Sequence, residues 1–419
     1  MSSITNTKAF LSHKDAEQDR NEGTRTYSPE ASYTEAIDKY RPLPNNPSFE
    51  IPSFVLPISE VNVYTANPDI KIAAFFLTKD KVVFCVHPQI LDAQKFPSKL
   101  KEKFEKPPFQ LSVTPTASTR SVVVMNHEDM PSFGMKLHFP FKISRFQRRV
   151  TDAHVKLGIS CTKEVQRGID ENKLPPRFAL IRDTIGISLK KFPEDDCSAG
   201  FLVREMTPYP YTKDSREIIP GFALYGNCLT NPKKLPYIVE LIEMLGEKDP
   251  KKFTLENIYF PIIQAFIEGY KNLGVLFELH GQNTLIEYDK ETGRPTRIVM
   301  RDSTSLCIDK NQRKRLGLSS DQFSYGLIED PELVKHKLSQ RYDYFMGHHF
   351  FEYLATTLEK HFKIPKNEIY QACKDEFKRL FPEHEQYMPK TVYEFSDKRD
   401  PVTGSPVLTD SKKAPLWRP

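Results

Sequence analysis

Residues 277–302 read FELHGQNTLIEYDKETGRPTRIVMRD, and the rest of the chain is best understood from this stretch. It contains two runs typical of β-strands, Thr284–Tyr288 and Thr296–Met300, which flank the polar, turn-forming residues 289–295. Strand-like runs on either side of a short segment rich in turn formers predict a β-hairpin. Such a hairpin brings the polar residues before its first strand close to those after its second strand.

Polar side chains gather at both ends of this predicted hairpin. Glu278 and His280 lie two positions apart, so on a continuous strand they share a face. Together with Asn283 and Asp302 they provide two carboxylates, an amide oxygen and an imidazole, which suit a site for Mg²⁺ and phosphate. Gly281 interrupts the strand pattern and would let a backbone or a ligand approach closely. The alternative is a solvated loop, which is the usual role of polar residues beside a turn.

The composition is that of a globular protein. The chain has 419 residues, of which 39% are hydrophobic and 27% charged, enough for two or three domains with a large core. Its formal net charge of +5 is too small to indicate nucleic-acid binding by itself. No apolar run approaches the roughly 20 residues that cross a membrane, and the first residues lack an export or transit pattern.

The six cysteines are scattered without a CxxC pair, which indicates free thiols in a reducing compartment. We therefore expect a cytoplasmic protein that binds neither a membrane nor nucleic acid.

The pattern of the chain divides it into four segments. Residues 1–48 are polar without periodicity, which predicts a disordered or loosely attached segment. Residues 49–150 are mostly strand-like, and residues 151–390 mix strands with helices, including the HGQN hairpin. Residues 391–419 form a tail that contains several prolines.

Individual elements can be predicted within these segments. Ile70–Phe76 and Lys81–His87 are rich in β-forming residues, and we expect them to pair as a hairpin. Residues Phe253–Leu273 carry an apolar stripe at helical spacing, which predicts a core helix. Tyr342–Phe362 is also predicted to be helical. The tail holds the only tryptophan, Trp417, which either anchors the tail or lies exposed.

Two segments upstream of the hairpin carry groups that suit anions. Residues 112–124 place small hydroxyl residues and Arg120 before a strand, and hydroxyl and guanidinium groups donate to phosphate oxygens. In residues 135–150, polar side chains alternate with apolar ones, and a basic cluster follows. The members of that face and cluster are Lys136, His138, Lys142, Ser144, Arg145, Arg148 and Arg149. Taken alone, each segment is better explained as a polar turn or a solvated basic face.

Taken in chain order, these polar groups resemble the motifs of a known family. The order runs from Ser118-Thr119-Arg120, through Lys136 with Arg148 twelve residues later, to Glu278-x-His280-Gly281-Gln282-Asn283 and Arg301-Asp302. It is similar to the IucA/IucC family, the aerobactin-synthetase-like NRPS-independent siderophore (NIS) synthetases. The HGQN hairpin is the most specific part. The likeness extends from about Val82 to about Lys390, with weaker similarity at Val86–Gln89.

The resemblance implies an α+β fold shaped as a cupped hand, with a thumb that is reduced or absent here. A β-rich fingers region would correspond to residues 49–150, and a mixed, helix-rich palm to residues 151–390. Family members use ATP and Mg²⁺ to activate a carboxylate of citrate or a related acid. An amine, hydroxylamine or alcohol then captures the acyl-adenylate to give an amide or ester in siderophore or other secondary-metabolite synthesis. Such enzymes often form homodimers.

The resemblance also transfers roles to residues. Those implied to contact the ATP phosphates are Ser118, Arg120 and Ser121. Those implied to hold nucleotide and carboxylate are Lys136, Ser144 and Arg148, with Gln282 near the nucleotide. His280 would lie beside the reacting carboxylate and α-phosphate, so the catalytic residues are His280, Arg148 and Lys136. The residues implied to surround Mg²⁺ are Glu278, Asn283 and Asp302. Cations and donors placed where negative charge develops are the main requirement of such chemistry.

The chain departs from the family pattern in several places. Its region before the first motif is short, and Ser121 stands where threonine is usual. Residues 303–305 are Ser-Thr-Ser, where the family tends to have an aromatic residue and glycine. That segment is expected near the substrate pocket, so the sequence leaves open which acid and which nucleophile are used.

Two classes of function therefore remain. One is an ATP-dependent carboxylate ligase, and the other is a non-catalytic relative that binds ATP or a carboxylate, or scaffolds a partner enzyme. The joint presence of Lys136, Arg148, His280 and Asp302 favours the ligase, because a scaffold needs none of them. The short N-terminal region favours the non-catalytic relative. Nucleic-acid binding through the basic residues of 95–106 and 145–149 fits poorly with the nearly balanced charge.

Overall fold

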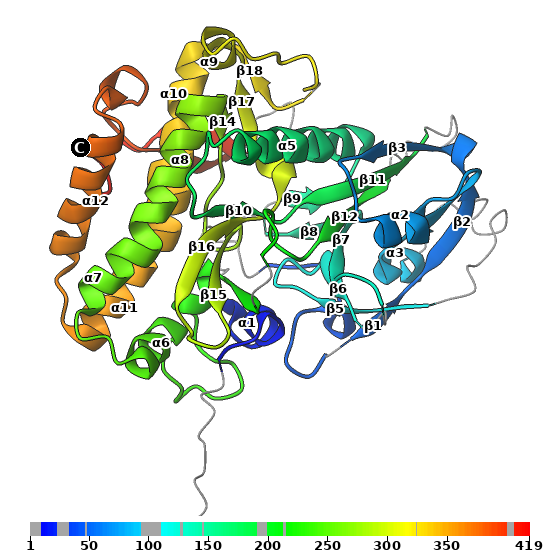
Figure 1. The fold of residues 1–419 in the computed structure, drawn as a ribbon, viewed down its shortest axis with the longest axis horizontal. Helices are drawn as coiled ribbons and strands as arrows, with labels where there is room; N and C mark the ends of the chain where they lie inside the picture. The colour runs from blue at the N-terminus through cyan, green and yellow to red at the C-terminus, as the bar shows by residue number, and fades with distance from the viewer. Residues whose placement is uncertain are drawn as a thin grey trace, which may run out of the picture.

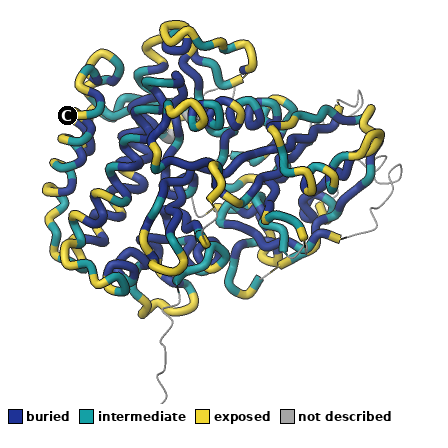
Figure 2. The backbone as a smooth tube through the Cα atoms, in the orientation of Figure 1, coloured by how far each residue is buried: buried dark blue, intermediate teal, exposed yellow. Residues whose placement is uncertain are grey.

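A computed structural model describes residues 10–22, 33–46, 48–93, 110–125, 129–144, 146–190, 199–212, 215–323, 325–399 and 406–419. A β-sheet region lies on one side and a layer of long helices on the other, with a smaller sheet between them (Figure 1). Buried positions run through both regions (Figure 2). Within the described ranges, no helix is long and apolar enough to cross a membrane.

The β-sheet region is built on a seven-stranded antiparallel sheet with the order β1-β5-β6-β7-β12-β11-β3. Its strands are β1 (Phe49–Ile51), β3 (Val61–Thr65), β5 (Leu111–Pro115), β6 (Ser121–Val124), β7 (Phe133–Leu137), β11 (Asp183–Leu189) and β12 (Gly200–Glu205). Helix α5 (Asp152–Asp170) packs closely on one face, where a Cβ on Gly186 would lie only 2.4 Å from Val155. Since β11 and β12 follow residue 150, the sheet takes two strands from beyond the segment predicted as fingers.

The predicted hairpin of Ile70–Phe76 with Lys81–His87 is wrong. Ile70–Phe76 forms helix α2, because the Asp69 carboxylate accepts the Lys71 N–H at 2.8 Å and so caps the first turn. The apolar side chains spaced four residues apart then face the sheet, whereas β4 (Lys81–Cys85) pairs with β2 (Ser53–Pro57). Other elements of this region are η2 (Asp38–Tyr40), η3 (Ile58–Glu60), α3 (Pro88–Asp92), β8 (Phe139–Ile143) and β9 (Phe146–Arg148).

The hairpin predicted from residues 277–302 is confirmed. Its strands β15 (Thr284–Asp289) and β16 (Pro295–Met300) pair antiparallel with Ile286 opposite Ile298. They form the middle of a four-stranded sheet with the order β10-β16-β15-β13. The outer strands are β10 (Phe178–Leu180) and β13 (Arg216–Pro220), and a further small sheet contains β14 (Val275–Leu276), β17 (Cys307–Asp309) and β18 (Leu327–Ile328).

The helical layer packs against this hairpin sheet. The predicted apolar stripe lies in α8 (Phe260–Leu273), where Ile262, Ile263 and Phe266 are at most 1% exposed. The predicted helix at Tyr342–Phe362 is present as η7, a π-helix (Gln340–Phe351), followed by α11 (Glu352–Phe362). The remaining elements are η4 (Gly221–Leu224), α6 (Tyr237–Leu245), α7 (Pro250–Thr254), η5 (Leu255–Tyr259), η6 (Ser303–Ser305), α9 (Lys310–Arg315), α10 (Pro331–Ser339), α12 (Lys366–Leu380) and η8 (His384–Gln386).

The prediction of a disordered or loosely attached segment at 1–48 is wrong for the residues that the structure describes there. Helix α1 (His13–Asp19) is packed into the molecule, with Glu17 and Gln18 buried. Arg20, only 1% exposed, donates to Glu240 at 2.8 Å. The polarity of this segment misled the prediction, because its polar groups are buried in paired form rather than solvated.

The C-terminal tail is anchored. Strands β19 (Tyr393–Arg399) and β20 (Pro406–Asp410) pair antiparallel beside η7. Trp417 is 2% exposed and stacks on Tyr259 with a centroid separation of 5.8 Å. The guanidinium of Arg418 donates to the buried carboxylate of Asp343. Of the two alternatives for the tryptophan, anchoring of the tail is therefore correct.

Candidate active site

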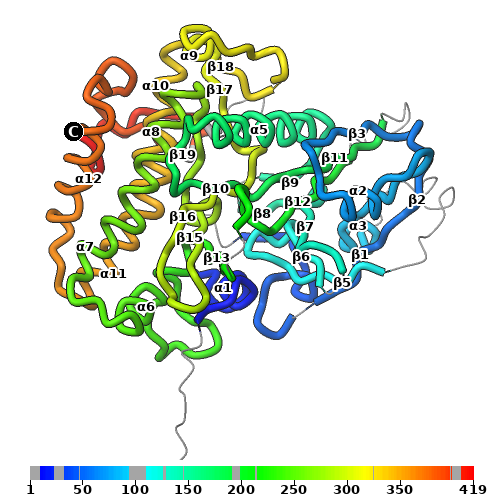
Figure 3. Tube along the Cα trace, in the orientation of Figure 1, coloured from blue at the N-terminus to red at the C-terminus, as the bar shows by residue number. Residues whose placement is uncertain are grey.

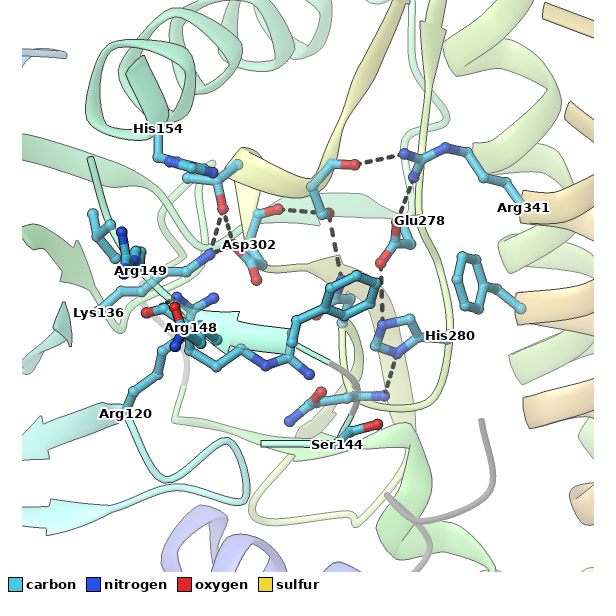
Figure 4. Close-up of a pocket in the computed structure, with 18 of the residues that line it drawn as sticks. Arg120, Lys136, Ser144, Arg148, Arg149, His154, Glu278, His280, Asp302 and Arg341 are labelled. Carbon is cyan, nitrogen blue, oxygen red and sulfur yellow. Dashed lines mark hydrogen bonds and ion pairs between the residues drawn. The ribbon is translucent and has the colours of Figure 1, made fainter. Parts of the chain in front are cut away.

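A cavity of about 390 Å³ lies between the seven-stranded sheet and the HGQN turn, and Figure 4 shows the groups around it. The predicted site residues that line it are Arg120, Lys136, Ser144, Arg148, Glu278, His280, Gln282, Asn283 and Asp302. The two remaining predicted residues, Ser118 and Ser121, line a smaller cavity of about 80 Å³ that shares several of the same residues. The fold thus brings every predicted site residue to one of two neighbouring cavities.

Two adjacent strands each contribute one residue to a different one of the two cavities. Ser121 on β6 lies directly opposite Lys136 on β7 in the sheet register. The turn before β6 is held by the Ser118 hydroxyl, which accepts the Ser121 N–H at 3.1 Å. Thr119 in this turn has a φ of +64°, in the left-handed region that a non-glycine residue rarely adopts. This arrangement fixes the hydroxyls of the Ser-Thr-Arg segment in the turn between β5 and β6.

Lys136 forms an ion pair with Asp302 and also donates to the Thr304 hydroxyl. Arg204 lies 3.8 Å from the same carboxylate. Burial by itself would raise the pKa of Asp302, but Lys136, Arg204 and Arg120 overcome it and hold that pKa well below its usual value. Asp302 is therefore ionised at neutral pH.

Burial and the neighbouring charges also shift the pKa of Lys136, in the direction that favours its neutral form. Burial lowers the pKa of Lys136 to about 8, and the nearby guanidinium groups of Arg120 and Arg204 lower it too, while Asp302 raises it. Lys136 thus changes its charge close to neutral pH, which a solvated lysine does not do.

Two arginines lie beside Lys136 at this end of the cavity (Figure 4). Arg120 donates from Nη1 to the Arg148 carbonyl at 2.9 Å, and Arg148 donates from Nε to the Ile143 carbonyl at 3.2 Å. These bonds hold the two side chains beside each other at the cavity. Ser144 has a φ of +58°, and its buried Oγ has no hydrogen-bond partner among the described residues. A ligand oxygen or amide would satisfy that hydroxyl.

The HGQN turn fixes the orientation of its histidine. The His280 carbonyl accepts the N–H groups of Asn283 and Thr284, both at 3.0 Å. The Gln282 N–H donates to His280 Nδ1 at 3.1 Å, so in this geometry Nδ1 is unprotonated and Nε2 carries the proton. Nε2 points toward a Glu278 oxygen 3.4 Å away, and both residues line the cavity (Figure 4).

Gly281 is required because the turn presses against the η4 segment. A Cβ at this position would lie 2.7 Å from the Tyr225 hydroxyl, and the Phe222 N–H donates to the Gly281 carbonyl at 2.9 Å. The close approach expected from this glycine is therefore made by the protein's own chain.

Glu278 is held from the helical layer. Its carboxylate accepts from Arg341 of η7 at 2.9 Å. Burial by itself would raise the pKa of Glu278, but Arg341 and His280 outweigh it, and the pKa is lowered overall. The negative charge of Asp302 acts in the raising direction on the same group. The site thus contains two ionised carboxylates that repel each other, each neutralised by a separate cation.

The oxygen set of Glu278, Asn283 and Asp302 fits Mg²⁺ in donor chemistry, because the ion prefers carboxylate and amide oxygens. Within the described residues, however, no three His, Cys, Asp or Glu side chains cluster closely enough to hold a metal by themselves. A magnesium ion here would therefore take only one or two carboxylates and complete its shell with phosphate oxygens and water.

The structure adds site residues that the sequence did not reveal. Arg341 and Lys337 bring positive charge from the helical layer, and Phe345 and Phe395 add an aromatic wall. Burial lowers the pKa of Lys337. Spacing could not identify them, because η7 and β19 join the site only through tertiary packing. The one signal in the sequence is that Arg341 stands beside the aromatic-rich run 342–351.

Comparisons with known proteins define the class to which this fold belongs. The structure of ATP-bound aerobactin synthetase IucA from Klebsiella pneumoniae matches with a TM-score of 0.76 over 98% of this chain and 78% of that chain, at 12% identity. The petrobactin biosynthesis protein AsbB from Bacillus anthracis matches with a TM-score of 0.71 over 93% of this chain and 72% of that one, at 13% identity. The fold is therefore that of the NIS synthetases, and the predicted α+β class is confirmed.

The sequence comparison agrees. The NRPS-independent siderophore synthetase rfs of Rhizopus delemar is 25% identical over 225 residues, which cover 52% of this chain and 34% of that protein. The match thus spans about a third of this relative's length. A family model described as ferric iron reductase FhuF-like transporter matches residues 261–418. The predicted resemblance to the IucA/IucC family is confirmed.

Proposed function

We propose that this chain is an ATP-dependent carboxylate ligase of siderophore or other secondary-metabolite synthesis. It adenylates citrate or a related carboxylic acid and condenses the activated acid with an amine, hydroxylamine or alcohol. The observation that carries the proposal is the convergence of Lys136, Arg148 and His280 on one cavity of about 390 Å³. The likeness to the ATP-bound IucA structure supports ATP as the nucleotide.

In the first step, a carboxylate oxygen of the acid attacks the α-phosphorus of ATP and pyrophosphate leaves. Arg120, Lys136 and Arg148 stabilise the negative charge that gathers on the phosphate oxygens. The His280 Nε2–H donates to the reacting carboxylate or to an α-phosphate oxygen. In the second step, the nitrogen or oxygen of the nucleophile attacks the acyl carbon and gives up a proton, AMP leaves, and an amide or ester remains. Mg²⁺, when bound by Glu278, Asn283 and Asp302, supplies further neutralisation of phosphate charge.

The proposal is tested by ATP–pyrophosphate exchange with purified protein, Mg²⁺ and a panel of citrate, 2-oxoglutarate, succinate and amino acids. Arg148→Ala and His280→Ala remove groups that line the cavity. Lys142→Ala is the matched control, because Lys142 is an exposed cation on β8 that does not line it.

We expect exchange with one acid, loss of exchange in both cavity variants, and no loss in the control. Binding of ATP without exchange for any acid would instead support the non-catalytic alternative. Equal exchange in all four proteins would contradict the assignment of the site.

A further inference from the structure

Helix α1 lies next to β5, which leads into the Ser-Thr-Arg turn, and next to β13, which pairs with β15, the strand that follows the HGQN turn (Figure 3). Its Glu17 is 2% exposed, and its two carboxylate oxygens have different partners, one in the Ser-Thr-Arg turn and one at the end of the hairpin. Oε2 accepts the N–H of Ala117, the residue before Ser118, at 2.8 Å. Oε1 accepts from Nη1 of Arg301, which closes the second strand of the hairpin.

Arg301 continues this connection to the HGQN turn. Its Nε donates to the Gln282 carbonyl at 2.7 Å, and its backbone N–H donates to the Asn283 carbonyl at 2.9 Å. One carboxylate from α1 therefore links the Ser-Thr-Arg turn to the HGQN turn through a single arginine. The two turns face each other across the smaller cavity of about 80 Å³, whose wall includes Ala117, Gln282 and Arg301.

We infer that Glu17 is a positioning residue that sets the spacing of the Ser-Thr-Arg and HGQN turns for nucleotide binding. This inference rests on the proposed function, and it means that helix α1 helps to position the nucleotide-binding residues. A shift of either turn changes which donors can reach the same phosphate oxygen, and small misplacements of binding groups weaken catalysis strongly.

Attachment of helix α1 to the rest of the protein does not by itself explain the contacts of Glu17. Attachment is already provided by Arg20, which donates to Glu240 and to the Leu235 carbonyl, both at 2.8 Å. Gln18 adds a bond of 2.9 Å to the Thr114 hydroxyl on β5. A buried ion pair is often no more stabilising than apolar packing. The pair of Glu17 with Arg301 is therefore better explained by the need to hold the two turns in a defined geometry. Arg301 and His13 also overcome the effect of burial and lower the pKa of Glu17, which keeps it charged.

The test compares Glu17→Gln with Arg20→Gln in the full chain. Both variants remove one buried charge from the N-terminal segment, but Arg20 donates to Glu240 and the Leu235 carbonyl, whereas Glu17 accepts from Ala117 and Arg301. Hydrogen–deuterium exchange is followed in peptides that cover residues 114–122 and 279–285. ATP–pyrophosphate exchange gives KM for ATP and kcat, and thermal unfolding reports stability.

For Glu17→Gln we expect the rate of hydrogen–deuterium exchange at both turns to increase by about tenfold. KM for ATP rises by about tenfold, with a smaller change in kcat. Arg20→Gln lowers the Tm but leaves the exchange of both turns and KM for ATP as in the wild type. Equal effects of the two variants on the turns and on KM would overturn the inference, because Glu17 would then only anchor the helix.

Two further measurements keep the result decisive. Glu17→Asp retains the charge but is one methylene shorter, so it cannot keep both contacts, and it replaces Glu17→Gln if that variant does not fold. A wild-type protein that binds ATP without exchange for any acid refutes the ligase proposal alone. In that case, hydrogen–deuterium exchange at the two turns and the dissociation constant for ATP still decide whether Glu17 positions the turns.

Discussion

Nucleotide affinity is expected to fall as pH rises from about 7 to about 9, because Lys136 loses its charge in this range. With a pKa of about 8 in the free protein, the protonated fraction of Lys136 drops from about nine-tenths to about one-tenth. Phosphate binds the ammonium form and raises its pKa in the complex. The dissociation constant for ATP therefore increases by about tenfold over these two pH units.

Protein stability responds to the same titration with the opposite sign. The pKa of Lys136 is lower in the folded protein than in the unfolded chain, so the unfolded chain binds more protons between about pH 8 and about pH 10. The contribution of Lys136 to the free energy of unfolding consequently rises by about 1 kcal/mol from pH 7 to pH 9. A protein that simply unfolds in alkali would lose affinity and stability together.

The assay is titration of the protein with ATP and Mg²⁺ by calorimetry at constant ionic strength, with urea unfolding measured at each pH. Lys136→Arg keeps a positive charge that does not titrate in this range, so its affinity profile is expected to be flat. Lys136→Met removes the charge and provides the reference for the stability difference. An equal loss of affinity in the wild type and in Lys136→Arg would refute the reasoning, because another group would then be titrating.

Three other outcomes are expected. Asp302→Asn moves the midpoint of the affinity profile to lower pH, because Asp302 raises the pKa of Lys136; an unchanged midpoint contradicts this coupling. Chelation of Mg²⁺ abolishes ATP–pyrophosphate exchange and added Mg²⁺ restores it, whereas exchange that persists in chelator argues against a metal at Glu278 and Asp302. Trp417→Ala lowers the free energy of unfolding by about 3–5 kcal/mol in urea titration, and a loss below about 1 kcal/mol would show that the tail is not part of the core.

Local patterns were sufficient to predict much of this fold. The hairpin of β15 and β16 followed from two strand-like runs around a turn-forming segment, and α8 followed from its apolar stripe. The candidate site residues were predicted from the family resemblance, and the fold brings these residues to two adjoining cavities. The error at Ile70–Phe76 has a local cause as well. β-Branched and aromatic residues favour strands only weakly, and the Asp69 cap together with helical spacing of buried side chains outweighs them.

The remaining features depend on contacts between distant segments, which no local pattern records. Helix α1 is polar, yet it is buried because its charges meet partners more than two hundred residues away, as Arg20 meets Glu240. Arg341 reaches the site in the same way, through the packing of η7 against Glu278. A polar segment whose partners are remote has the same composition as a disordered one, so composition alone cannot separate them.

Two cations of the site, Lys136 and Arg341, are already paired with carboxylates inside the protein, and this affects what binding of an anion involves. Lys136 pairs with Asp302, and Arg341 pairs with Glu278, each across segments that are far apart in sequence. A triphosphate or a carboxylate that enters the cavity therefore shares cations that carboxylates already hold. Binding exchanges one set of partners for another, so its net free energy is smaller than the number of cations suggests. The benefit is that the donors are oriented before the ligand arrives, and donors that need not reorganise contribute most where charge develops in a reaction.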